Sequence, residues 1–238
     1  MEATGAALVT MGNLSILPRR GDRSAVFPNP VRGCLHGGAS ILSFGLTLYF
    51  LGHPTARGPL DSLLVGCALS HALLFLVSAS YHSMPWQRIA KARMQRLDHS
   101  MIYVKIAGSM GPFAWLAFDE TMATRWIAAG WSVALLGIVQ KAFFPGVHPR
   151  TSTFVQVLQA LLFLPVLLEL LDRAPGSISR LLCFAALVYS VGAIVFILER
   201  PRLWPRVFSF HELFHLLVVL GSASIGSVLL GLAYGAPG

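Results

Sequence analysis

Charged residues are scarce in this chain of 238 residues. Asp, Glu, Lys and Arg together make up 12% of the sequence, whereas hydrophobic residues make up 55%. Soluble domains carry about 25% charged residues, because they must cover an apolar core with polar surface. The deficit excludes an ordinary soluble domain and indicates an integral membrane protein, whose solvent is lipid.

Cysteine is also rare. The three cysteines, Cys34, Cys67 and Cys183, lie in or at the edge of apolar runs, and none has CxxC spacing. This pattern excludes a disulfide framework and a zinc ribbon, and it is typical of small buried side chains. The first five residues lack a basic segment, so a cleaved signal peptide is not expected.

Seven apolar runs are long enough to cross about 30 Å of hydrocarbon, which takes about 20 helical residues. They occupy residues 34–52, 60–82, 99–118, 125–144, 153–171, 180–198 and 208–232. The sequence therefore predicts an all-α fold, an integral membrane bundle of seven transmembrane helices over residues 33–232. A flexible N-terminal segment (1–32) would precede the bundle, and a short tail (233–238) would follow it.

The net charge of +8 comes from basic residues in the short segments between these runs. Thirteen Lys and Arg residues fall on the side of the N-terminus and four on the other side, while Lys105 lies inside the third run. Because basic residues concentrate in cytoplasmic loops, this bias predicts a cytoplasmic N-terminus and an external tail. We interpret the charge as a topology signal of a multi-pass plasma (cell) membrane protein and expect no nucleic-acid partner.

Several polar side chains fall within the predicted spans at similar depth. His82 ends the second run, Asp98 immediately precedes the third, and His211 and His215 lie near the start of the last. Ionisable groups cost about 2.5–3.5 kcal/mol each in a membrane helix, so they are usually paired or functional. Residues four apart share a helix face, which allows His211 and His215 to offer two nitrogens to one metal ion.

For single residues, simpler interpretations stay open. A lone membrane histidine is more often structural than a ligand, Asp98 could cap the third helix, and Ser78 could bond to its own helix backbone. No special role is expected for four histidines near helix ends or in loops: His36, His53, His99 and His148. The convergence of three imidazoles and a carboxylate on one layer nevertheless favours a metal site.

These residues lie in motifs that resemble the hemolysin III group. The motifs are Ser78-Ala-Ser-Tyr-His82, then Leu97-Asp98-His99-Ser100 with Ile106-Ala107-Gly108 and Pro112, and finally Phe210-His211-Glu212-Leu-Phe-His215. The resemblance extends over residues 33–232. The group belongs with the progestin and adipoQ receptor family and is more distantly similar to the alkaline ceramidases. It implies seven helices with a cytoplasmic N-terminus.

The resemblance also implies a zinc site. His82, His211 and His215 match the three ligands, Asp98 matches the carboxylate that holds the zinc-bound water, and Ser78 matches the serine one turn before the first ligand.

Two residues depart from the group's pattern. Arg32 stands where an Asn is expected, with no Glu nearby, and Lys105 occupies a normally apolar position seven residues after Asp98. Seven residues return to nearly the same helix face. We therefore expect Lys105 to point inward, toward Asp98 or an anionic substrate group.

Three histidine ligands leave an open coordination position, which is typical of catalytic zinc. Asp98 would orient the activated water and take its proton, and Ser78 is a candidate donor to an oxyanion. The similarity to ceramidases implies zinc-dependent hydrolysis of C–N amide bonds in lipids. Membrane lipids are the expected partners, as substrate or ligand, and no obligate protein partner is indicated.

Three other functions stay open at this point. Zinc could brace a receptor or regulatory protein without turnover, or the protein could be cytolytic, as the group's name implies. The segment His211-Glu212-Leu213-Phe214-His215 also fits the H-E-x-x-H metalloprotease motif, with Glu212 as general base. The carboxylate that serves as base, Asp98 or Glu212, distinguishes the lipid hydrolase from the protease.

Overall fold

The computed structural model describes residues 30–144, 147, 149–204 and 208–235. Within these residues the chain forms eight helices: α1 (Pro30–Gly52), α2 (Pro59–Ser83), α3 (Arg88–Ala117), α4 (Glu120–Phe143), α5 (Pro149–Leu161), α6 (Leu164–Arg173), α7 (Gly176–Leu198) and α8 (Phe210–Tyr234). The all-α fold is thus confirmed. Residues 1–29 of the predicted N-terminal segment and 236–238 of the predicted tail lie outside the described residues, so these two predictions are not tested, although α1 starts at Pro30 and α8 extends to Tyr234.

The fifth predicted span consists of two consecutive helices, α5 and α6. Regular helix geometry is interrupted at Leu162 and Phe163, and the Phe163 amide donates to the Ala160 carbonyl three residues back. Pro165 follows directly, and its ring nitrogen has no hydrogen with which to continue the helical bonding. The eight helices therefore correspond to the seven predicted spans.

Six of these spans, among the described residues, are long and apolar enough to cross a membrane. The exception is α3, which starts at Arg88 and carries four basic residues before Asp98. Large apolar side chains are exposed along the outer faces of the bundle, for example Ile41, Leu42 and Leu136. Such a surface suits lipid, and it supports a multi-pass membrane protein.

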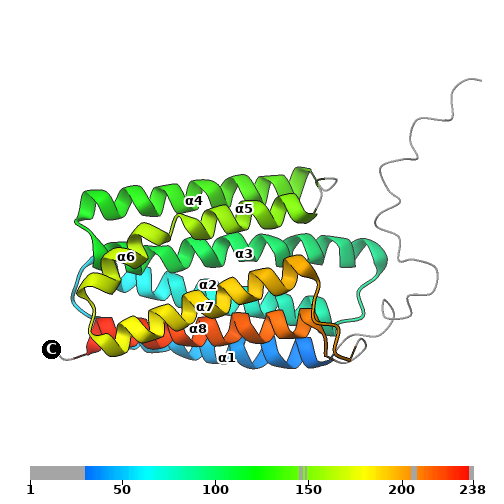
Figure 1. Ribbon diagram of the computed structural model, residues 1–238, viewed down its shortest axis with the longest axis horizontal. Helices are drawn as coiled ribbons and strands as arrows, with labels where there is room; N and C mark the ends of the chain where they lie inside the picture. The colour runs from blue at the N-terminus through cyan, green and yellow to red at the C-terminus, as the bar shows by residue number, and fades with distance from the viewer. Residues whose placement is uncertain (1–29, 145–146, 148, 205–207, 236–238) are drawn as a thin grey trace, which may run out of the picture.

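The helices lie side by side in one bundle (Figure 1), in which α3 contacts α2, α4, α5 and α6, and α8 contacts α1, α2 and α7. The first and last helices are therefore neighbours. Helices α1, α3 and α8 begin at the same end of the bundle, where α2 ends; this end is on the right in Figure 1. All the polar residues singled out above from α2, α3 and α8, apart from Lys105, belong to this end.

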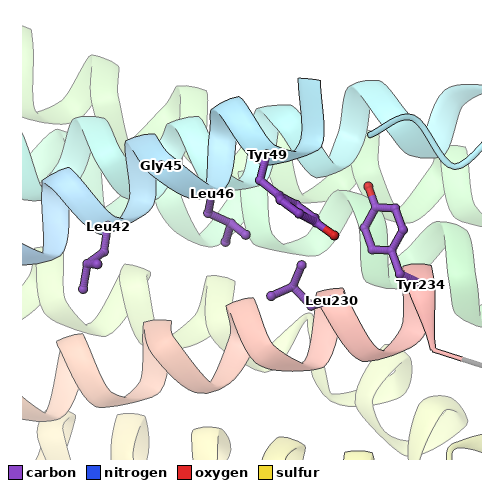
Figure 2. Close-up of a pocket in the computed structure, with 6 residues that line it drawn as sticks. All are labelled: Leu42, Gly45, Leu46, Tyr49, Leu230 and Tyr234. Atoms are coloured by element: carbon purple, nitrogen blue, oxygen red, sulfur yellow. The ribbon is translucent and has the colours of Figure 1, made fainter. Parts of the chain in front are cut away.

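The core toward the opposite end is apolar. It includes Phe50, Leu60, Phe113 and Leu229. Between α1 and α8 an open groove of about 530 Å³ is lined by Leu42, Gly45, Leu46, Tyr49, Leu230 and Tyr234. Figure 2 shows the two tyrosine rings at one end of this groove and Leu42 at the other. At the tyrosine end of the groove, α1 and α8 still contact each other through the rings of Tyr49, Phe50 and Tyr234.

Candidate metal centre

Three histidines from two helices meet at the polar end of the bundle. His82 lies in the last turn of α2, and His211 and His215 lie in the first two turns of α8. One ring nitrogen from each can be chosen so that all three lie within 4.8 Å of one another. In the part of the chain that the structure describes, this is the one group of three or more His, Cys, Asp or Glu residues with such spacing.

The three rings surround a common point and do not form a flat stack. The His82 ring stands nearly perpendicular to the rings of His211 and His215, with centroids 5.4 and 4.9 Å away. The centroids of His211 and His215 are 4.8 Å apart.

Two buried nitrogens of this group, His82 Nε2 and His215 Nδ1, have no hydrogen-bond partner. A buried polar atom without a partner costs about 1–3 kcal/mol. Imidazole nitrogens in threes are ligands that zinc takes readily, and three of them leave one coordination position open. The residues present therefore fit a zinc ion, which would satisfy these atoms.

Asp98 lies inside α3, ten residues after the helix starts at Arg88. It therefore does not cap the third helix, which was one interpretation of the sequence. Its carboxylate is buried and hydrogen-bonds to the side chain of Ser78, itself buried one turn before His82 on α2. Asp98 and Ser78 thus form a pair whose serine lies one turn before His82, and Asp98 is not part of the histidine group.

Glu212 has a different environment, although it lies in sequence between His211 and His215. Its Oε2 accepts a hydrogen bond from the Ser209 backbone nitrogen at 2.8 Å, and its Oε1 accepts one from Arg32 Nε at 2.7 Å. Ser209 and Glu212 together form a capping box at the start of α8. Both oxygens are engaged and Glu212 is 1% exposed, which argues against a role as general base.

The Arg32–Glu212 ion pair is a contact that sequence reasoning missed. The S-x-x-E pattern of Ser209 to Glu212 signals the capping box, but no local pattern signals the pairing with α1. The charge of Arg32 lies within electrostatic range of all three clustered histidines. Because Glu212 neutralises this cation, the pair would lessen its repulsion of a metal ion held by the histidines.

Lys105 is buried, with 7% of its surface exposed, but it does not pair with Asp98. Its ammonium donates to the Tyr189 hydroxyl at 2.5 Å, and that hydroxyl is 3.0 Å from Ser222 Oγ. The Tyr189 ring fits against α8 because Gly221 has no side chain there; a Cβ would lie 2.6 Å from the ring. The predicted approach to Asp98 is therefore replaced by contacts with α7 and α8.

The remaining histidines differ in environment. His53 is exposed, and its Nδ1 donates to the Tyr49 carbonyl at 2.9 Å, while His148 lies outside the described residues. His99 is partly buried on α3. His36, for which the sequence predicted no special role, is buried on α1 and stacks on the ring of His215.

Comparison with known proteins adds an independent finding. A family model described as haemolysin-III related matches residues 26–225, which include all three clustered histidines. The chain is 30% identical to "Hemolysin-3" of Bacillus cereus over 190 residues, which cover 79% of this chain and 84% of that protein. It is 33% identical to the "Hemolysin-3 homolog" of Bacillus subtilis (strain 168) over 157 residues, which cover 66% and 70% of the two chains.

Proposed function

Because this chain belongs to the haemolysin III-related family of the proteins just compared, we propose that its histidine cluster is the zinc centre of a membrane hydrolase that cleaves amide bonds in lipids. The observation that carries the proposal is the cluster itself. Three imidazole nitrogens lie within 4.8 Å of one another, and two of the three rings carry a buried nitrogen without a hydrogen-bond partner. A buried carboxylate, that of Asp98, lies on the neighbouring helix α3.

Each polar residue has a distinct task in this scheme. His82, His211 and His215 hold the ion, which when bound would supply a Lewis acid and activate water. Asp98 orients the attacking water and accepts its proton. Ser78 hydrogen-bonds to Asp98, which fixes the carboxylate and occupies the serine hydroxyl. Ser78 is therefore better suited to positioning Asp98 than to donating to an oxyanion.

A lipid substrate suits the surroundings of this site. The outer faces of the bundle are apolar, so a substrate with acyl chains can approach from the membrane. The distribution of basic residues predicts that the end of the bundle with the histidines is cytoplasmic. We therefore place the site near the cytoplasmic leaflet of the plasma membrane, with membrane lipids as partners.

A regulatory or receptor protein with structural zinc is the second candidate. The ligands come from α2 and α8, which have little direct contact elsewhere, so a shared ion would brace these two helices. In this case the zinc would stabilise the bundle without turnover, and Asp98 would be dispensable. The names of the two Bacillus relatives refer to a hemolytic activity of those proteins.

The test compares two variants of the purified protein in detergent. His211→Ala should lose most of the zinc, measured by elemental analysis. Asp98→Asn should keep the zinc and lose hydrolysis of N-acylated lipids such as ceramides, followed by mass spectrometry of the released fatty acid. Zinc retained in both variants would exclude the proposed ligand set, and hydrolysis retained in Asp98→Asn would exclude the role of Asp98. Zinc in the wild type with no hydrolysis of any lipid amide would favour the structural role.

A further inference from the structure

His36 is a fourth imidazole at the histidine cluster, contributed by a third helix. The centroids of the His36 and His215 rings are 4.0 Å apart, and the ring planes differ by 30°. On another side the His36 ring meets the edge of Phe75, with centroids 5.0 Å apart. Only 4% of His36 is exposed. The ring is therefore held between α2 and α8, against one of the proposed ligands.

Neither ring nitrogen of His36 has a hydrogen-bond partner, although the backbone of His215 comes near the ring. A neutral imidazole carries one N–H donor and one acceptor, and leaving such groups unpaired in a buried place is costly. The unpaired nitrogens of His82 and His215 lie in the same cluster. Two nitrogens of His36, one of His82 and one of His215 are thus unpaired in one buried region. A polar group bound among them would satisfy these atoms.

The position of His36 is fixed by contacts on both sides of α1. One turn before it, Arg32 pairs with Glu212 on α8; one turn after it, Ser40 Oγ donates to the Ala72 carbonyl of α2 at 3.0 Å. Gly33 lets α1 approach the end of α2, since a Cβ there would lie 1.8 Å from Ser83 Oγ. The imidazole is therefore presented to the cluster by a helix that cannot easily rotate or shift.

We propose that His36 binds, through a ring nitrogen, the oxygen-bearing group that takes the open coordination position of the metal centre. This role rests on the proposed zinc site and names one more residue of it. His36 is not itself a ligand, because it is not a member of the group of nitrogens that lie within 4.8 Å of one another. Its partner is instead the water or the substrate carbonyl that the three ligand histidines leave room for.

The test uses cobalt in place of zinc, because the visible absorption of cobalt reports changes in its ligands. Full-length protein loaded with cobalt in detergent is titrated with acetohydroxamate, a small oxygen ligand. His36→Phe keeps a ring for stacking but has no nitrogen, whereas His36→Asn keeps a hydrogen-bonding amide without the ring. Ser40→Ala is the matched control, because it removes a bond of α1 to α2 on the same face without touching the cluster.

We expect His36→Phe to take up cobalt in the same amount as the wild type and to bind acetohydroxamate about 5- to 10-fold more weakly, as for one lost hydrogen bond. His36→Asn should recover part of this affinity, and Ser40→Ala should bind as the wild type does. Equal affinity in His36→Phe and the wild type would overturn the proposal and leave only ring packing. Loss of cobalt from His36→Phe, with full cobalt in Ser40→Ala, would overturn it as well, because His36 would then be a ligand.

These outcomes separate this role from the proposed function. Wild-type protein that takes up no cobalt and no zinc would exclude the metal centre, and with it the role of His36. If the wild type binds cobalt and acetohydroxamate, and His36→Phe binds acetohydroxamate with the same affinity, the metal centre stands and only the role of His36 is excluded.

Discussion

Replacing Glu212 with Gln should lower the stability of the protein while leaving its metal content unchanged. The two oxygens of Glu212 accept hydrogen bonds from the Ser209 backbone nitrogen and from Arg32 Nε. Glutamine keeps one side-chain oxygen, which suffices for a capping box. Its amide nitrogen cannot accept the second bond, and the negative charge opposite Arg32 is lost. The variant therefore keeps one of two interactions.

The size of the effect follows from these contacts. A hydrogen bond to a charged group contributes about 1.5–3 kcal/mol, and a neutral one about 0.5–1.5 kcal/mol. The Arg32 side chain is 26% exposed, so solvent recovers part of the loss when its partner disappears. We expect Glu212→Gln to cost about 1–2 kcal/mol, which for a chain of this length lowers the melting temperature by roughly 2–8 °C. Glu212→Ala also removes the cap, which adds about 0.5–2 kcal/mol.

The assay heats detergent-solubilised protein and measures the folded fraction by size-exclusion chromatography, together with zinc content. Glu199→Gln is the matched control, since Glu199 is exposed at the end of α7 and belongs to no ion pair within the described residues. A Glu212→Gln variant that melts like the wild type would refute the structural role assigned to Glu212. A variant of normal stability and zinc content that has lost all hydrolysis would instead identify Glu212 as the base.

Three further predictions concern the metal, the buried lysine and the orientation. Removing zinc with a chelator should lower the melting temperature by roughly 5–10 °C, because the ion would link α2 to α8. The comparison is with protein at a free zinc concentration about 100 times the Kd, and equal melting temperatures would contradict the zinc site. Tyr189→Phe should destabilise the protein more than Lys105→Met, since it leaves the buried ammonium without its acceptor; the opposite order would show that the ammonium has no need of Tyr189. Reporter fusions should place the N-terminus in the cytoplasm and the C-terminus outside, and two ends on the same side would contradict seven spans.

Hydropathy located the helices well but not the ends of those that extend beyond the membrane. The predicted second span, 60–82, differs from α2 by one residue at each end. The predicted third span starts at residue 99, whereas α3 starts at Arg88. The residues from Arg88 to Asp98 continue the helix with a charged sequence, which a search for apolar runs does not register. Helix formation depends on backbone hydrogen bonding and propensity, while hydropathy reports the solvent.

The sequence predicts those parts of the candidate site whose residues share a helix face. It does not predict contacts between residues of different helices. His211 and His215 follow from spacing alone, and Ser78 and His82 lie one turn apart on α2. Arg32 and His36 contact residues about 180 positions away in sequence, and no local pattern indicates which helices become neighbours. Arg32 has no Glu near it in sequence, and its partner Glu212 becomes a neighbour only when α1 packs against α8.

Glu212 illustrates how two motifs that share a residue can be separated by helix geometry. Consecutive residues of an α-helix project about 100° apart, so Glu212 cannot point in the same direction as His211 and His215. It lies in the first turn of α8, where its carboxylate reaches back to the Ser209 nitrogen and sideways to Arg32 on α1. A base for water at the histidines must come from a helix that faces them. In the proposed function Asp98 on α3 would be that base, held by Ser78 one turn from His82, while Glu212 holds the start of α8.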